Sequence, residues 1–98
     1  MTWTTWTAEY VHARCGYRFY AHAYVDKHDT HTLIAEAGPV EESGIVGHPT
    51  YRKVAACNEI GERRAIRGIK SDLAMDGYSL VSEGFTEFSY INITDHDN

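Results

Sequence analysis

The sequence predicts an α+β fold, in which an antiparallel sheet of four to five strands carries one helix on one face. Two observations lead to this prediction. Residues 17–26 alternate apolar and polar side chains, which is the period of a half-buried strand. Residues 51–75 instead repeat apolar side chains at the spacing of one helix face. Strand-like segments before and after the helical segment give the expected order β-β-β-α-β(-β), within a single domain of residues 1–98.

The first two strands are expected to form a hairpin. Residues 2–13 are rich in Thr, Trp, Tyr and Val, which favour strands. Residues 14–17 contain Gly16, which can adopt the positive φ of a tight turn. In residues 17–26 the alternation assigns Tyr17, Phe19, Ala21, Ala23 and Val25 to one side, and Arg18, Tyr20, His22, Tyr24 and Asp26 to the other.

A third strand and the helix follow. Residues 27–30 read as a turn and residues 31–37 as a strand, which Gly38-Pro39 ends. After a loop, the helix is expected to begin near Pro49-Thr50, because proline suits the first turn. Asp76-Gly77 should end the helix.

Beyond the helix, Tyr78–Glu83 reads as the next strand, and residues 85–94 as a further strand or its continuation. Asp95-His96-Asp97-Asn98 reads as a frayed polar end. We therefore expect one face of the sheet to stay uncovered by a helix.

The helix should have an apolar and a basic face. Winding residues 51–75 at 100° each gives an apolar face of Val54, Ala55, Ala65, Ile66, Ile69 and Leu73, and a basic face of Arg52, Arg63, Arg67 and Lys70. The basic face is either simply solvated or suited to a phosphate backbone or an acidic protein surface. Gly61 and Gly68 either weaken the helix or allow a close approach to the sheet.

Asn58 and Glu62 fall on the apolar face of the helix. A carboxylate there is unfavourable unless it is paired, solvated in a cleft or bound to a metal. The position of Glu62 therefore needs an explanation.

Charge is unevenly distributed along the chain. The net charge of −5 combines −3 in residues 1–49, +4 in residues 50–70 and −6 in residues 71–98. Such segregation gives surfaces of opposite potential, which orient partners without determining the fold.

Several function classes find little support. No apolar run is long enough to cross a bilayer and the first residues do not read as a signal peptide, so we expect a cytoplasmic protein with no membrane partner. Cys15 and Cys57 are then expected to be free thiols. The segments 28–31 and 95–97 contain His and Asp, but short segments of this kind are usually polar turns, and no phosphate-binding loop is present.

One stretch of the chain, roughly residues 5–84, resembles the front half of the ribonuclease H-like fold. The resemblance rests on Asn58, Glu62, Ala65-Ile66, Gly68-Ile69 and Ser82-Glu83, placed after three strands. It implies a reduced metal-dependent nuclease in which Glu62 and Glu83 bind Mg²⁺ or Mn²⁺. The family's first-strand aspartate aligns with Ala8, where this chain departs from the family; Glu9, the third carboxylate of this alternative, would point to the other face.

Our main prediction is a small acidic binding protein that needs no cofactor. Tyr20, His22 and Tyr24 would lie on the uncovered sheet face, unless Trp3, Trp6 or the chain ends fold over them. At the level of class, the chain resembles small inhibitors from phages and mobile elements, such as anti-CRISPR and anti-restriction proteins.

That resemblance implies a protein partner with a basic nucleic-acid-binding surface. Carboxylates would imitate DNA phosphates there while Tyr20 and Tyr24 anchor the complex. The candidate carboxylates are Asp72, Asp76, Glu83, Glu87, Asp95 and Asp97. The alternatives are the nuclease and a homo-oligomeric structural subunit that pairs through the uncovered sheet face.

Overall fold

The computed structural model describes residues 3–40 and 48–86, which form a sheet and a helix. The elements in chain order are β1 (Thr4–His12), β2 (Arg18–Val25), β3 (Thr32–Pro39), β4 (Tyr51–Ala56), α1 (Glu59–Met75) and β5 (Tyr78–Phe85). The five strands lie in the order β4-β3-β2-β1-β5, and every neighbouring pair is antiparallel. The α+β prediction with one helix is therefore confirmed.

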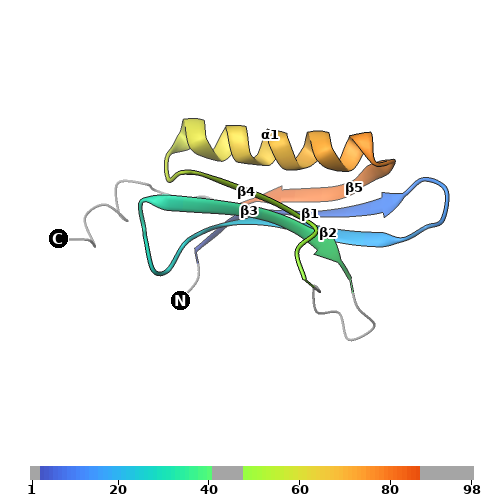
Figure 1. Cartoon of the computed structure of the whole chain (residues 1–98), viewed down its shortest axis with the longest axis horizontal. Coiled ribbons are helices and arrows are strands. Elements are labelled where there is room, and N and C mark those ends of the chain that lie inside the picture. The colour runs from blue at the N-terminus through green and yellow to red at the C-terminus, as the bar shows by residue number, and fades with distance from the viewer. Residues whose placement is uncertain (1–2, 41–47, 87–98) are drawn as a thin grey trace.

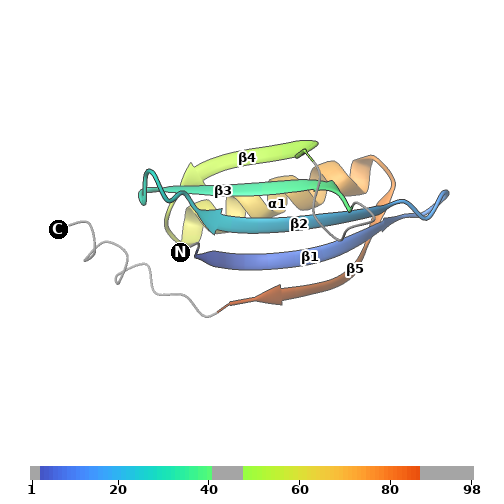
Figure 2. The same ribbon diagram turned by 90° about the horizontal axis from the view of Figure 1, so that it is seen from below.

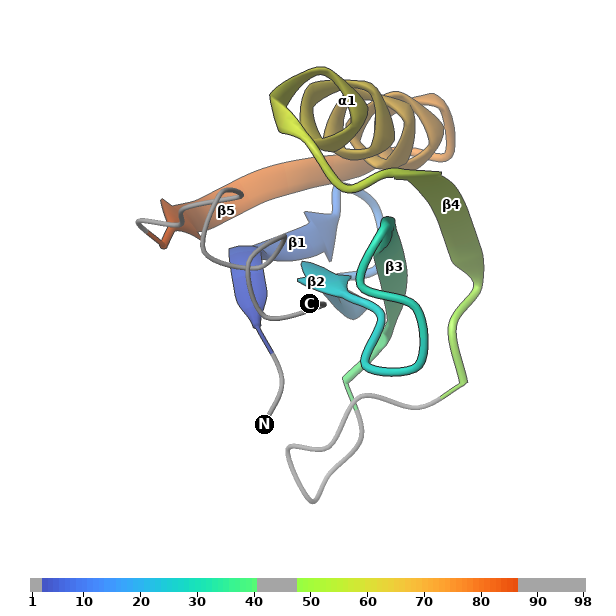
Figure 3. The same cartoon turned by 90° about the vertical axis from the view of Figure 1, so that its left-hand side faces the viewer.

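The helix covers one side of the sheet. Figure 1 shows α1 running along the sheet on a single side, and Figure 3 shows the same two layers along the strands. Within the described residues, no element lies over the opposite side, which we call the open face. Strands β4 and β5 form the two edges, and α1 connects them.

The core lies between α1 and the sheet. Alternate residues of the first three strands are buried there, and α1 contributes its apolar face. The buried set comprises Trp6, Ala8, Tyr10, Phe19, Ala21, Ala23, Leu33, Ala35, Ala37, Ala65, Ile66, Ile69 and Leu73. The alternation predicted for β2 and the apolar face predicted for residues 65–73 are thus confirmed. Because Trp6 belongs to this core, it does not cover the open face.

The turns follow the expected chemistry. Gly16, between β1 and β2, has φ +71°, and Gly77, after α1, has φ +90°, so both use the freedom that glycine has at positive φ. Between β2 and β3 the side chain of Asp29 accepts hydrogen bonds from the backbone N–H of His31 and the hydroxyl of Thr32. These bonds fix the second hairpin.

The predicted start of the helix is wrong. Residues 51–56 form the edge strand β4, paired with β3 from Ala37↔Tyr51 to Thr32↔Ala56. The helix begins after Asn58, whose side-chain oxygen accepts the backbone N–H of Gly61 at 2.7 Å. Asparagine is a strong N-cap residue, so it marks the boundary that the periodicity missed. Val54 is consequently exposed on β4 rather than buried on the helix.

Gly61 allows the first turn of α1 to lie against the end of β4. A Cβ atom at this position would lie 2.9 Å from the carbonyl carbon of Ala56 and would overlap its carbonyl oxygen. Gly68 lies under the side chain of Lys53 instead. The sequence left open whether Gly61 weakens the helix or allows a close approach to the sheet. The structure shows the close approach.

Candidate functional site

A row of three rings lies on the open face of β2. Tyr20, His22 and Tyr24 alternate with the buried residues of the strand, so they point away from α1. The ring centroids of Tyr20 and His22 are 5.8 Å apart, and those of His22 and Tyr24 are 4.9 Å apart. All three residues are half-buried. The structure therefore brings together the ring residues that the sequence assigned to this face.

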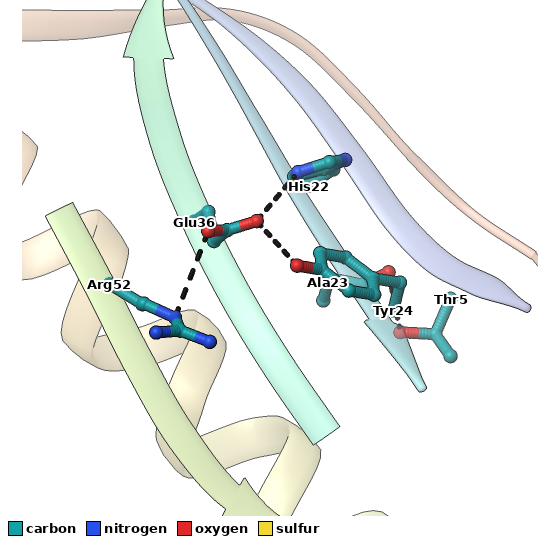
Figure 4. Close-up of polar contacts among 6 residues, drawn as sticks. All are labelled: Thr5, His22, Ala23, Tyr24, Glu36 and Arg52. Atoms are coloured by element: carbon teal, nitrogen blue, oxygen red, sulfur yellow. Dashed lines mark hydrogen bonds and ion pairs between the residues drawn. The ribbon is translucent and has the colours of Figure 1, made fainter. Parts of the chain in front are cut away.

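Glu36 holds two members of this row, His22 and Tyr24, in place. Its register partners are His22 on β2 and Arg52 on β4, so the three side chains share one line across the sheet. The hydroxyl of Tyr24 donates to Glu36 Oε1 at 2.6 Å, and His22 Nε2 lies 3.4 Å from the same oxygen. Arg52 Nε lies 3.8 Å from Oε2 (Figure 4). The carboxylate thus has contacts with side chains from both neighbouring strands.

The electrostatics of this network keep Tyr24 protonated. Burial raises the pKa of Tyr24 to about 12, and the hydrogen bond to Glu36 adds to the effect. The phenol therefore stays protonated, and able to donate, to a higher pH than an ordinary tyrosine. The Glu36 side chain is only 13% exposed, because its own partners surround it.

A depression of about 490 Å³ opens beside the network. The rings of His22 and Tyr24 and the side chain of Ile34 form part of its wall, and Arg52 and the β2–β3 turn complete it. Apolar and polar groups therefore meet at one concave place on the open face, which is typical of recognition sites.

The described members of the predicted phosphate-imitating set lie elsewhere. Asp72 is bound by Lys53, with 3.1 Å between Nζ and Oδ2, and Asp76 accepts the hydroxyl of Tyr51. Both acids belong to the helix and its C-cap, on the other side of the sheet from Tyr20 and Tyr24. Glu87, Asp95 and Asp97 lie outside the described residues. The ring residues and the described acids are thus not brought together into one surface.

Glu83 connects the helix to the sheet. Its Oε2 lies 2.8 Å from Lys70 Nζ and accepts the indole N–H of Trp6 at 3.0 Å. Lys70 also lies over the Trp6 ring, 5.9 Å from its centroid. The hydrogen bonds from Lys70 and from Trp6 lower the pKa of Glu83. This carboxylate therefore has a structural role between α1, β1 and β5.

The carboxylates of the nuclease alternative do not meet. Glu9 pairs with Tyr20 and Ser82 on the open face, whereas Glu83 contacts Trp6 and Lys70 on the helix side. Glu62 lies in the first turn of α1. Within residues 3–40 and 48–86, no group of three His, Cys, Asp or Glu side chains is arranged to hold a metal ion.

The basic helix face needs one correction. Arg52 belongs to β4 and contacts Glu36 on the open face, so its assignment to the helix is wrong. Arg63 and Arg67 are exposed on α1 as expected, while Lys70 is bound to Glu83.

Glu36 is the functional candidate that the sequence analysis missed. A signal existed, because Glu36 is the one charged residue in the otherwise apolar segment Leu33–Ala37. Such a residue on the polar side of a strand suggests a partner on the neighbouring strand. Identifying His22 and Arg52 as those partners requires the register, which only the structure provides.

No helix in the described part of the chain has the length and apolar character needed to cross a membrane. Comparisons with protein-family models, curated proteins and solved structures found no match for this chain. The functional argument therefore depends on the geometry of the open face.

Proposed function

We propose that this chain is a non-enzymatic binding protein that occupies the surface of a protein partner with its open face. The observation that carries the proposal is the ring row Tyr20, His22 and Tyr24 on this face, in which His22 and Tyr24 contact Glu36 and Tyr20 lies against the His22 ring. Tyrosine is enriched at recognition surfaces, because a rigid ring buries much apolar area and its hydroxyl still forms a hydrogen bond.

The network supports binding because it fixes the rings in advance. Tyr24 is held by Glu36 at 2.6 Å, and the His22 and Tyr24 rings contact each other. Side chains that are already ordered lose less conformational entropy when a partner binds. Arg52 extends the surface, since its side chain is 58% exposed while its Nε lies near Glu36. Arginine and tyrosine are the residue types that most often dominate binding energy.

The inhibitor class remains part of this proposal, and it rests on sequence character alone. In the phage and mobile-element inhibitors that the chain resembles, the partner is a host complex that handles nucleic acid. The described helix and strand carboxylates Asp72, Asp76 and Glu83 have cationic or hydroxyl partners of their own. We therefore assign the contact with such a complex to the open face, with the acidic segment 87–98 as a further contribution.

Matched surface variants test the proposal. The tagged protein would be used to capture binders from a host lysate, and the binder would then be purified and titrated. Tyr20→Ala and Arg52→Ala should each weaken its binding at least tenfold, the loss expected for a residue that dominates binding. The control variant Arg63→Ala/Arg67→Ala changes the exposed side of α1 and should bind like the unmodified chain. Loss of binding in the helix variant, with full binding by both open-face variants, would refute the proposal.

A further inference from the structure

The outer edge of β5 is open to another strand. β5 pairs with β1 along its inner side, and no strand among the described residues pairs with its other side. An edge strand presents a row of backbone N–H and C=O groups that can pair with a further strand.

Exposed apolar side chains are concentrated on this strand. Leu80, Val81 and Phe85 are 45%, 60% and 61% exposed. Figure 2 shows the cause: α1 lies behind β4, β3 and β2, while β5 runs along the margin of the sheet. The cross-strand neighbours Trp6 and Tyr10 of β1 are buried, whereas these three side chains of β5 remain exposed.

The two edges of the sheet differ in charge. β4 carries Lys53, which is bound to Asp72, and Arg52, whose side chain is 58% exposed; an exposed cationic side chain on an edge opposes pairing with another copy of the same strand. β5 has one acidic residue, Glu83, whose carboxylate is bound by Lys70 of its own chain. β5 therefore resembles an interface strand, whereas β4 resembles a protected edge.

We propose that β5 pairs antiparallel with β5 of a second copy, which makes a two-fold symmetric dimer with one continuous sheet. In a two-fold symmetric interface the same strand of both copies comes together, so any free charge on it would face a like charge. Glu83, the one charged residue of β5, is already paired with Lys70, so this repulsion is weak. The two-fold axis is perpendicular to the sheet, so both α1 helices lie on the same side. Antiparallel pairing also places the exposed apolar side chains of the two β5 strands next to one another.

The dimer is independent of the proposed function of the open face. It uses the edge of the sheet and leaves Tyr20, His22 and Tyr24 exposed in both copies. The dimer would present two ring rows on one continuous surface, so a partner with repeated sites would bind more tightly through avidity.

Light scattering on the purified chain tests the dimer. We expect twice the mass of one chain, falling to the mass of the monomer in Val81→Lys, because a lysine on the edge prevents strand pairing. Val54→Lys is the matched control, since Val54 is 61% exposed on the other edge, and it should stay dimeric. Thermal melts of both variants would check that they are folded. A monomeric unmodified chain, or a dimer that only Val54→Lys dissociates, overturns the proposal.

Cysteine cross-linking tests the pairing itself. In a Cys15→Ser/Cys57→Ala background, single cysteines are introduced at Ser79, Ser82 or Gly84, which share the open side of β5. Only the position closest to the two-fold axis should form an efficient disulfide between copies, because antiparallel pairing separates equivalent residues elsewhere. Equal cross-linking at all three positions would indicate parallel pairing or random collisions, and would contradict the antiparallel dimer.

Discussion

The backbone of Gly61 lies directly against the carbonyl group of Ala56, with no room for a Cβ atom between them. This contact holds the first turn of α1 against the end of β4. Only two residues, 57 and 58, lie between the strand and the helix.

Replacing Gly61 with alanine should destabilise the protein. Alanine favours a helix by about 1 kcal/mol over glycine, but moving backbone atoms to make room costs about 1–3 kcal/mol. We expect a net loss of up to about 2 kcal/mol in the free energy of unfolding measured with urea, the difference between these two effects.

Gly68→Ala is the matched control. Its Cβ atom would meet only the flexible Lys53 side chain, at 3.2 Å from Cε. The helix preference should then prevail, giving unchanged stability or a gain of up to about 1 kcal/mol. If Gly61→Ala and Gly68→Ala lose equal free energy of unfolding, close packing on Ala56 is not the cause of the loss at Gly61.

The Tyr24–Glu36 hydrogen bond should couple the two side chains energetically. Tyr24→Phe removes the donor and leaves a half-buried carboxylate with one contact fewer, so we expect a loss of about 1–2 kcal/mol. A double-mutant cycle with Glu36→Gln measures the coupling, which should be at least about 0.5 kcal/mol. Additive effects of the two substitutions would mean that the Glu36 network does not hold Tyr24.

Stability should fall at alkaline pH because of the tyrosines. Burial raises the pKa of Tyr24 to about 12 and raises that of Tyr51 further, with help from hydrogen bonds to Glu36 and Asp76. The folded state therefore disfavours the phenolate relative to the unfolded state. Stability from these groups is complete below the ordinary tyrosine pKa of 10.0 and is lost as the pH rises through the folded-state values.

Urea unfolding between about pH 9 and about pH 12 measures this loss of stability. The range begins about one unit below the ordinary tyrosine pKa and ends about two units above it. Tyr24→Phe should flatten the decline. A decline of equal steepness in the variant would contradict the assignment to Tyr24.

Glu83 should contribute stability that disappears in acid. The bonds from Lys70 and Trp6 lower the pKa of Glu83, so its stabilising effect is present above the unfolded-state value of 4.5 and is lost as the pH falls through the lower folded-state value. Glu83→Gln should lower the melting temperature at neutral pH. The difference in melting temperature between Glu83→Gln and the unmodified chain should shrink in acid. A difference in melting temperature that does not change with pH would mean that packing, and not charge, is the cause.

Local patterns made much of the fold predictable. The alternation in β2 reports directly which side of that strand is buried, and Gly16 and Gly77 stand where positive φ is needed. The ring row followed from the same alternation.

Residues 51–56 were not predictable in this way. Their apolar residues fit a helical face as well as an edge strand, and pairing with β3, a non-local interaction, decides between the two. The Glu36 network depends on register for the same reason. The role of Glu83 depends on how far α1 lies from β5, which no local pattern of residues encodes.

The order of the strands also has a consequence for folding. β1 to β4 each pair with the strand next to them in sequence, whereas β5 returns to pair with β1, so that Trp6 lies opposite Phe85. Contacts between residues so distant along the chain form slowly, because a long loop must close first. We therefore expect the four-stranded meander to assemble early and the β1–β5 pairing to complete the native state, so that intermediates expose the long edge of β1.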